Sequence, residues 1–262
     1  MTKRRITCLQ INIQFGDVEA NLQAVANQFN QLDADVDTVV LPEFWPMGYS
    51  LDILDEIVEY DMLTPIKTLA KQYNVDVIAG SVPTKRDGKF YNSLPVITRE
   101  GEVTFWYDKV HLFRLMDEEK FLAEGKDNGV FTLQGISSAA VICYDIRFPE
   151  WIKTQMLENI DVLYVVAEWP KQRLDHWRAL LIARAIENQV YVVACNRVGH
   201  DPNNTFAGHS MVIDPWGQVI EEADDQIGIL TAEIDLAEVK RIRQEIPIYE
   251  DRRPDLYRLK KD

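Results

Sequence analysis

Three residues that could carry out chemistry follow short runs of strand-forming residues. Cys143 follows the apolar run that begins at Ala139, Glu43 follows Val36 to Leu41, and Lys109 follows a stretch rich in aromatic and β-branched residues. The length and side-chain types of these runs are typical of strands. Open α/β folds carry their chemistry just beyond the carboxyl ends of strands, so the three side chains are candidates for one site. Taken singly, each is also typical of an ordinary buried cysteine, solvated glutamate or surface lysine.

The three residue types fit one reaction, the hydrolysis of an amide. This reaction needs a nucleophile, a group that carries a proton from the nucleophile to the departing amine, and a fixed positive charge where the carbonyl oxygen becomes negative. Cysteine, glutamate and lysine supply these in that order. A neighbouring carboxylate disfavours a thiolate and an ammonium group favours it, so a thiol poised between the two can exchange one proton with the carboxylate.

The residues after Cys143 are typical of a helix start. The run Phe148-Pro149-Glu150 places proline at an early position and glutamate in the first turn. A thiol at such a strand-to-helix junction lies near unpaired backbone N–H groups, which offer donors to an oxyanion and lower the pKa of a cysteine. This setting predicts a lowered pKa for Cys143. Arg147 and Glu150 are candidates for an ion pair that supports the junction.

A Cys/His pair is the main competing chemistry. The chain has four histidines, His111, His176, His200 and His209, and the first and last of them are the candidates for such a pair. We interpret both as structural hydrogen-bonding residues. No Cys/His spacing in the sequence matches a zinc site, so we expect neither a metal nor a cofactor.

Composition narrows the function classes. The chain has 262 residues, with 28 Lys and Arg against 42 Asp and Glu, a net charge of −14. This balance argues against nucleic acid as a partner, and an anionic substrate would need a local cluster of Arg or Lys. Three widely spaced cysteines without a C-x-x-C motif indicate a reducing compartment. No run approaches the ~18 apolar residues of a membrane span. We expect a cytoplasmic protein with no membrane partner.

The order of strand and helix patterns predicts an α/β fold with more than one layer. Helix and strand alternate early and again after residue 148, with antiparallel pairs between them and at the end. No linker divides residues 1–262, so we predict a single domain that ends in a helix and arm at about 236–262, packed across the domain or against a partner subunit. The expected strands include 90–98 and 102–107, a hairpin, then 130–133, 139–142 and 162–167; the expected helices include 64–73 and 148–157 and others that begin after Asp17 and at Asp175.

Three segments of the sequence resemble the signatures of a known family. LPEFW around Glu43, YDKVHLF around Lys109 and VICYDIRFPEW around Cys143 look like the three motifs of the nitrilase superfamily of carbon–nitrogen hydrolases. The resemblance covers nearly the whole chain, from CLQINIQFGD through RAIENQVYVVACNRVG and FAGHSMVIDPWG to IPIYEDRRPDLY. Three motifs in the expected order are far more specific than any one of them. Within the superfamily, the chain is most similar to the omega-amidase branch.

The resemblance implies a fold and a set of roles. The fold would be a four-layer α-β-β-α sandwich that continues across a homodimer. Glu43 would act as general base and then acid, Lys109 would stabilise the oxyanion, and Cys143 would be the nucleophile. Many members also carry a second glutamate in the loop after the lysine, and Glu118 matches this position best, with Glu119 as the near alternative.

The resemblance also implies a substrate, a small 2-oxo dicarboxylate monoamide such as 2-oxoglutaramate. Its amide would be cleaved through a cysteine thioester, and the backbone N–H of Tyr144 would join the lysine in holding the oxyanion. The far carboxylate needs a cation, and Arg can hold it with two hydrogen bonds. Arg173 is our candidate, with Lys171 behind it.

Two other readings of the sequence stay open. Another amidase, an N-carbamoyl hydrolase or a nitrilase of the same superfamily would carry the same three residues. A catalytically silent binding or scaffold protein is disfavoured because all three chemical positions hold competent residues.

Overall fold

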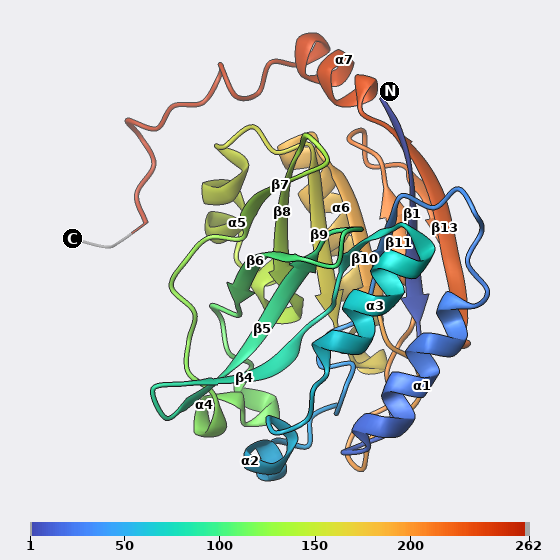
Figure 1. Cartoon of the computed structure of the whole chain (residues 1–262). Helices are drawn as coiled ribbons and strands as arrows, with labels where there is room; N and C mark the ends of the chain where they lie inside the picture. The colour runs from blue at the N-terminus through green and yellow to red at the C-terminus, as the bar shows by residue number, and fades with distance from the viewer. Residues whose placement is uncertain (1, 260–262) are drawn as a thin grey trace.

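Two β-sheets lie face to face in the computed structural model, which describes residues 2–259 (Figure 1). The first sheet has the strand order β13-β1-β2-β3-β5-β4, with β6 also paired to β5. The second has the order β12-β11-β10-β9-β8-β7. The first sheet is built from β1 (Lys3–Gln10), β2 (Thr38–Val40), β3 (Asp76–Ile78), β4 (Val82–Arg86), β5 (Lys89–Ile97), β6 (Val103–Asp108) and β13 (Gly228–Asp235). The second is built from β7 (Val130–Leu133), β8 (Ile136–Ile142), β9 (Val162–Ala167), β10 (Tyr191–Asn196), β11 (Met211–Ile213) and β12 (Val219–Glu222).

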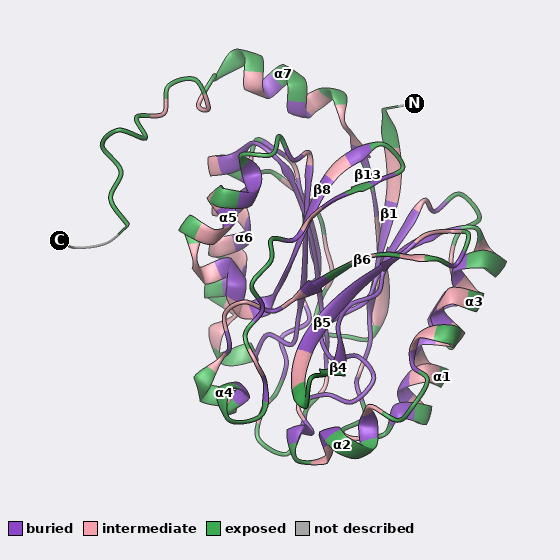
Figure 2. Cartoon of the chain, turned by 60° about the vertical axis from the view of Figure 1, so that its left-hand side comes forward, coloured by how far each residue is buried: buried purple, intermediate pink, exposed green. Residues whose placement is uncertain are grey.

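Helices cover the outer face of each sheet. In Figure 2 the strands form a buried middle layer, with α5 and α6 on one side and α1 and α3 on the other. The helices are α1 (Val18–Phe29), α2 (Leu54–Ile57), α3 (Leu63–Tyr73), α4 (Glu118–Phe121), α5 (Pro149–Met156), α6 (Leu174–Asn188) and α7 (Ala237–Glu245). This arrangement within the chain confirms the predicted α-β-β-α layers. Its continuation across a homodimer stays a prediction.

Apolar burial explains the layers. One cluster of buried side chains joins the facing surfaces of the two sheets and extends to α5 and α6, and a second fills the space between the first sheet and α1 and α3. Strands β8, β9 and β10 are parallel neighbours, and their residues are almost all buried, as expected for strands covered on both faces. The sandwich therefore holds the ends of these strands in fixed positions.

The predicted elements agree closely with the structure where the sequence is uniformly apolar. The bounds 130–133 and 162–167 match β7 and β9, and the predicted hairpin corresponds to β5 and β6. Asp17 caps α1 as expected, because its side chain accepts a hydrogen bond from the backbone N–H of Ala20. Strand β4 was not predicted. Its sequence, VPTKR, has a proline and two cations, which suit a strand at the edge of a sheet.

The C-terminal segment begins as predicted, with α7 directly after β13. Beyond this helix, the chain to residue 259 runs along and away from the body as a mostly exposed arm (Figure 1). Residues 260–262 of the predicted arm lie outside the described residues. None of the helices in the described part of the chain has the length and apolar character needed to cross a membrane.

Candidate active site

Glu43 lies in the turn after β2, at the end of the sandwich where the strands deliver their carboxyl ends. The segment after β3 packs closely against this turn: Gly80 has φ +59°, and a Cβ there would lie 2.0 Å from the carbonyl oxygen of Pro42. The Glu43 side chain has no exposed area. Its carboxylate accepts four hydrogen bonds, to Oε1 from Lys109 Nζ (2.8 Å), Asn92 Nδ2 (2.9 Å) and the Tyr49 hydroxyl (3.0 Å), and to Oε2 from the backbone N–H of Glu168 (2.9 Å). This carboxylate is therefore held in one place and one orientation.

Lys109 follows β6 and is also fully buried. Its backbone is fixed on both sides, because its N–H donates to the Asn92 carbonyl (2.9 Å) and its carbonyl accepts from the Gly125 N–H (2.8 Å). Its Nζ lies 2.8 Å from both Glu43 Oε1 and Glu118 Oε1. Burial by itself lowers the pKa of Lys109, but the two carboxylates outweigh it and hold this pKa well above its ordinary value. The side chain is therefore a permanent cation.

Glu118 is the second carboxylate on Lys109, at the start of α4. Its Oε2 accepts a hydrogen bond from the Phe113 N–H (2.5 Å). Burial, together with the negative charge of Glu43, raises the pKa of Glu118 even though Lys109 acts in the opposite direction. The neighbouring Glu119 is exposed and points to a different hollow. Of the two alternatives, the structure therefore brings Glu118 to the lysine.

Cys143 follows β8 directly and opens a short 3₁₀ turn that covers Cys143–Arg147. It adopts φ +45°, in the left-handed region that non-glycine residues adopt only uncommonly and at some cost in strain. The buried carboxylate of Asp145 secures this turn. It accepts hydrogen bonds from the backbone N–H of Ile142 (3.1 Å), the Tyr107 hydroxyl (2.7 Å) and both the backbone N–H (3.0 Å) and ring Nδ1 (2.8 Å) of His111.

Asp145 also links Cys143 to Lys109. Tyr107 and His111 lie two residues before and two residues after Lys109, and both bind the carboxylate that lies two residues after Cys143. The two catalytic candidates, far apart in sequence, are thus fixed to one anchor. This role confirms the interpretation of His111 as a structural hydrogen-bonding residue.

The expected lowering of the Cys143 pKa is wrong. Burial, and next the negative charge of Glu43, raise the pKa of Cys143 well above its ordinary value, and the opposing effect of Lys109 is too small to reverse this. The sequence indicated the nearby backbone N–H groups and the cation, but it could not indicate the depth of burial. The resting residue is a neutral thiol, which needs a base before it can attack.

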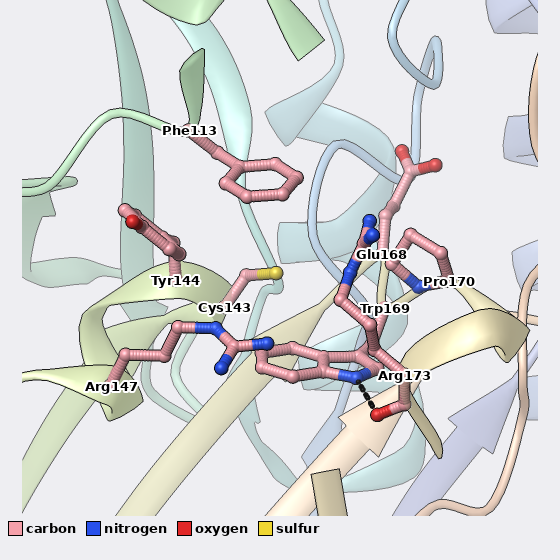
Figure 3. Close-up of a pocket in the computed structure, with 8 residues that line it drawn as sticks. All are labelled: Phe113, Cys143, Tyr144, Arg147, Glu168, Trp169, Pro170 and Arg173. Atoms are coloured by element: carbon pink, nitrogen blue, oxygen red, sulfur yellow. Dashed lines mark hydrogen bonds between the residues drawn. The ribbon is translucent and has the colours of Figure 1, made fainter. Parts of the chain in front are cut away.

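Cys143 faces a pocket that two arginines share (Figure 3). Its sulfur points into a space with the ring of Phe113 on one side and the guanidinium groups of Arg147 and Arg173 on others. The Arg147 guanidinium lies 4.7 Å from the ring centroid of Trp169, and that of Arg173 lies 5.4 Å from the Phe113 ring. The remaining lining residues are Tyr144, Glu168 and Pro170.

Glu168 connects the pocket to a buried ion pair behind it. Its Oε2 accepts a hydrogen bond from Arg197 Nη1 (2.9 Å), and neither side chain is exposed. Burial raises the pKa of Glu168 to about 8, against the influence of Arg197. Because the Glu168 backbone N–H binds Glu43, this pair holds one of the donors that orient the candidate base.

The comparison with protein families decides the classification of this chain. The family described as carbon-nitrogen hydrolase matches residues 5–244. The chain belongs to this family. The hydrolase is 45% identical over 258 residues to a 2-oxoglutaramate amidase of Bacillus subtilis, which covers 97% of this chain and 100% of the relative. It is 36% identical to the omega-amidase YafV of Escherichia coli, over 94% of this chain and 96% of the relative.

A solved structure gives the same result for the fold. XC1258 of Xanthomonas campestris, described as a CN-hydrolase superfamily protein with an arsenic adduct in the active site, is 31% identical to the hydrolase with a TM-score of 0.92. The match covers 99% of this chain and 100% of that chain. Together with the family match, this confirms the resemblance to the nitrilase superfamily that the three motifs indicated.

The candidates from the sequence are placed as follows in the hydrolase. Glu43, Lys109 and Glu118 form one buried cluster, and the charges of all three affect the pKa of Cys143. Tyr144 and Arg173 line the adjoining pocket. Lys171, the second candidate cation for the far carboxylate of the substrate, does not line the pocket. Its side chain is exposed and pairs with Asp225 (3.1 Å). His209 hydrogen-bonds Glu222 Oε1 (2.8 Å) outside the cluster, as its structural interpretation required.

Three residues of the site were missed or misread. Tyr49 and Asn92 contact the candidate base, and neither lies beside a motif residue in a way that would reveal this. The ion pair for which Arg147 and Glu150 are candidates does not form among the described residues. Arg147 instead packs on Trp169 and contacts His176 Nδ1 (3.2 Å). Its position four residues after the cysteine, one helical turn on, was the available signal.

Proposed function

We propose that this hydrolase is an amidase that cleaves the terminal amide of a small 2-oxo dicarboxylate monoamide, such as 2-oxoglutaramate, to the acid and ammonia. The observation that carries the proposal is the meeting of a neutral thiol, a buried carboxylate and a permanent ammonium group beside a pocket with two arginines. The names of the relatives, 2-oxoglutaramate amidase and omega-amidase, support the same substrate class.

The first step is attack by Cys143. Glu43 takes the thiol proton as the sulfur bonds to the amide carbon, so the S–H bond breaks while an O–H bond forms on the carboxylate. Oxygen Oε1 of Glu43 already accepts three hydrogen bonds and Oε2 only one, which favours Oε2 as the oxygen that receives the proton. The electron pair of the carbonyl bond moves to oxygen, which becomes negative.

Lys109 stabilises the oxyanion in this scheme. Two of its three N–H groups donate to Glu43 and Glu118, and the third faces only a long contact with the Tyr49 hydroxyl (3.4 Å). That third N–H is available for the oxyanion, together with the backbone N–H of Tyr144, which lies in the first turn of the 3₁₀ segment and has no acceptor within it. Glu118 positions the lysine.

Collapse of the adduct releases ammonia. Glu43 gives its proton to the amide nitrogen, the C–N bond breaks, and the acyl group remains on Cys143 as a thioester. Water then attacks the thioester with Glu43 again as the base, and the acid leaves as the thiol is restored. In this last step the C–S bond breaks and Glu43 returns the proton from water to the departing Cys143 thiolate, so one carboxylate serves as base, acid, base and acid in turn and no other proton carrier is needed.

Arg147 and Arg173 account for the second carboxylate of the substrate. The chain carries a net charge of −14, yet two guanidinium groups lie beside the candidate nucleophile. Burial lowers the pKa of Arg147, and the neighbouring positive charge of Arg173 acts in the same direction. The far carboxylate of the substrate, alone or together with the 2-oxo group, can accept hydrogen bonds from both guanidinium groups.

The direct test is a panel assay of ammonia release by the purified protein. We expect kcat/KM to be highest for 2-oxoglutaramate, below it for an uncharged amide such as butyramide, and lowest for aliphatic nitriles and N-carbamoyl amino acids. A panel led by nitriles or carbamoyl compounds would replace the proposed reaction with one of those activities.

The arginines are tested by Arg173→Ala and Arg147→Ala. Each should raise the KM for 2-oxoglutaramate by about 10- to 100-fold, the effect expected from the loss of one charge-assisted hydrogen bond. The KM for butyramide should stay nearly unchanged. Arg241→Ala is the matched control, because this arginine is exposed on α7. An unchanged KM for 2-oxoglutaramate in Arg173→Ala would remove that residue from the substrate site.

The homodimer implied by the resemblance belongs to the proposal as well. Light scattering in solution should give twice the chain mass of 30.3 kDa. A mass equal to one chain at assay concentration would reject it.

A further inference from the structure

Tyr49 reaches the catalytic cluster from the loop after Glu43. Its ring packs edge-on against Phe44, with the centroids 5.5 Å apart. Its hydroxyl oxygen lies 3.0 Å from Glu43 Oε1, 3.0 Å from Glu118 Oε1 and 3.4 Å from Lys109 Nζ. The hydroxyl is thus equidistant from the two carboxylates that flank the lysine.

A hydroxyl group has only one hydrogen, so Tyr49 can donate to only one of these carboxylates at a time. With the lysine protonated and both carboxylates ionised, the cluster carries a net charge of −1 in a buried place. The proposed reaction changes this balance in every turnover, because Glu43 becomes neutral when it takes the thiol proton. The better acceptor for the Tyr49 hydrogen then becomes Glu118.

We propose that Tyr49 is a positioning residue for amide hydrolysis, whose hydroxyl donates to Glu43 while that carboxylate is ionised and turns to Glu118 while Glu43 holds the proton. The O–H bond of Tyr49 rotates and does not break, so the step needs no other reactant. The inference rests on the proposed reaction and adds a residue to it.

The surroundings of the hydroxyl keep it a donor throughout. Burial raises the pKa of Tyr49 well above its ordinary value, and the negative charges that face it, Glu118, Glu43, Cys143 as thiolate and Glu168, act in the same direction. Lys109 is the cation in contact with it. A phenol in this setting stays protonated over the working pH range and offers its hydrogen to whichever carboxylate is charged.

The test is Tyr49→Phe, measured as kcat/KM against pH. Loss of a hydrogen bond to an anion makes that anion easier to protonate, so the midpoint of the acid limb should move up by about one pH unit. We expect kcat at the optimum to fall about tenfold and KM to change little. Tyr191→Phe is the matched control, because its buried hydroxyl donates to the Asp235 carbonyl (3.1 Å) away from the cluster.

A second variant changes the hydrogen bond and keeps the shape. Site-specific 3-fluorotyrosine at position 49 is a stronger donor, so it should move the acid limb to lower pH, opposite to Tyr49→Phe. If Tyr49→Phe fails to fold, the 3-fluorotyrosine protein still allows the acid limb to be measured. A lower kcat in Tyr49→Phe with an unmoved acid limb in both variants would make Tyr49 merely structural and would overturn the proposal.

A readout without substrate separates this inference from the proposed function. Infrared difference spectra over a pH series, with Glu43→Gln as the reference, follow protonation of the Glu43 carboxylate directly, and the midpoint of this protonation should move in the same directions. If the protein cleaves no amide but these shifts appear, the proposed function fails and the role of Tyr49 in the cluster stands. If 2-oxoglutaramate is hydrolysed and neither profile shifts, the inference about Tyr49 fails alone.

Discussion

Replacement of Glu43 by glutamine separates the two effects of this residue on Cys143. The carboxylate is the proposed base, and its charge also raises the pKa of the thiol. Glu43→Gln keeps the shape of the side chain. Lys109 keeps a partner, because Glu118 Oε1 remains 2.8 Å from its Nζ, and the net charge of the cluster changes from −1 to 0. We therefore expect the variant to fold.

The substitution should lower the free energy of unfolding modestly, and the loss can be worked out from the hydrogen bonds. The glutamine oxygen can replace Oε1 and keep its three donors. The NH₂ group then faces the backbone N–H of Glu168, which loses its acceptor. One unsatisfied buried donor costs about 1–3 kcal/mol, so urea unfolding should show a stability loss within that range.

The effects on chemistry should have opposite signs. Loss of a general base costs about 10²- to 10⁴-fold in kcat/KM for amide hydrolysis. Two unit charges in contact, at about 4 Å, interact by ~4 kcal/mol at an effective dielectric constant of about 20, so removal of the Glu43 charge should lower the pKa of Cys143 by at most about 3 units. The variant should be a poor hydrolase with a thiol that ionises at lower pH.

Two assays on the same sample measure this. Ammonia release gives the loss of hydrolysis, and iodoacetamide alkylation over a pH series, followed by peptide mass spectrometry, gives the ionisation of Cys143. Glu119→Gln is the matched control, because Glu119 is exposed and outside the cluster. Hydrolysis within tenfold of the wild type, or a Cys143 that alkylates only at higher pH, would refute the reasoning.

Two further predictions concern Lys109. Lys109→Met leaves two buried carboxylates without a cation and should cost about 3–5 kcal/mol at neutral pH. The pKa of Glu118 is already raised by burial, and it should rise further without Lys109. The variant should therefore be most stable below the unfolded-state pKa of about 4.3 and lose stability as pH rises toward the folded-state pKa. Urea unfolding over a pH series measures this, and stability that does not fall as pH rises would contradict it. Gly125→Ala would place a Cβ 2.1 Å from the Asp108 carbonyl oxygen and displace the lysine, so both activity and melting temperature should fall. Gly228→Ala, with nothing within 4 Å of its Cβ, should change neither, and equal effects in the two would reject the steric explanation.

The sequence predicts well what depends on local pattern. Uniformly apolar, β-branched runs such as Val162 to Ala167 have one stable solution, a strand buried on both faces, so the bounds of β9 agree with the structure. The placement of Glu43, Lys109 and Cys143 beyond strand ends also followed from pattern, because strand ends at one edge of a sandwich bring distant segments together.

What local pattern could not predict depends on burial and tertiary contact. The acidic run around Glu118 is typical of a solvated face, and only the capture of one carboxylate by Lys109 makes it part of a core. The direction of the Cys143 pKa depends on burial outweighing a nearby cation, which no spacing reveals. Tyr49 contacts Glu118 across 69 positions of sequence, and periodicity carries no information about such a pair.

The central claim, a covalent path through Cys143, is tested most directly by trapping the acyl-enzyme. The protein is mixed with 2-oxoglutaramate, quenched with acid within one turnover, and mapped by peptide mass spectrometry. We predict an adduct with the mass of the substrate less ammonia on the Cys143 peptide and none on Cys8 or Cys195, which are fully buried and serve as internal controls. Ammonia released within the quench time with no adduct on Cys143, or an adduct on either other cysteine, would contradict the claim.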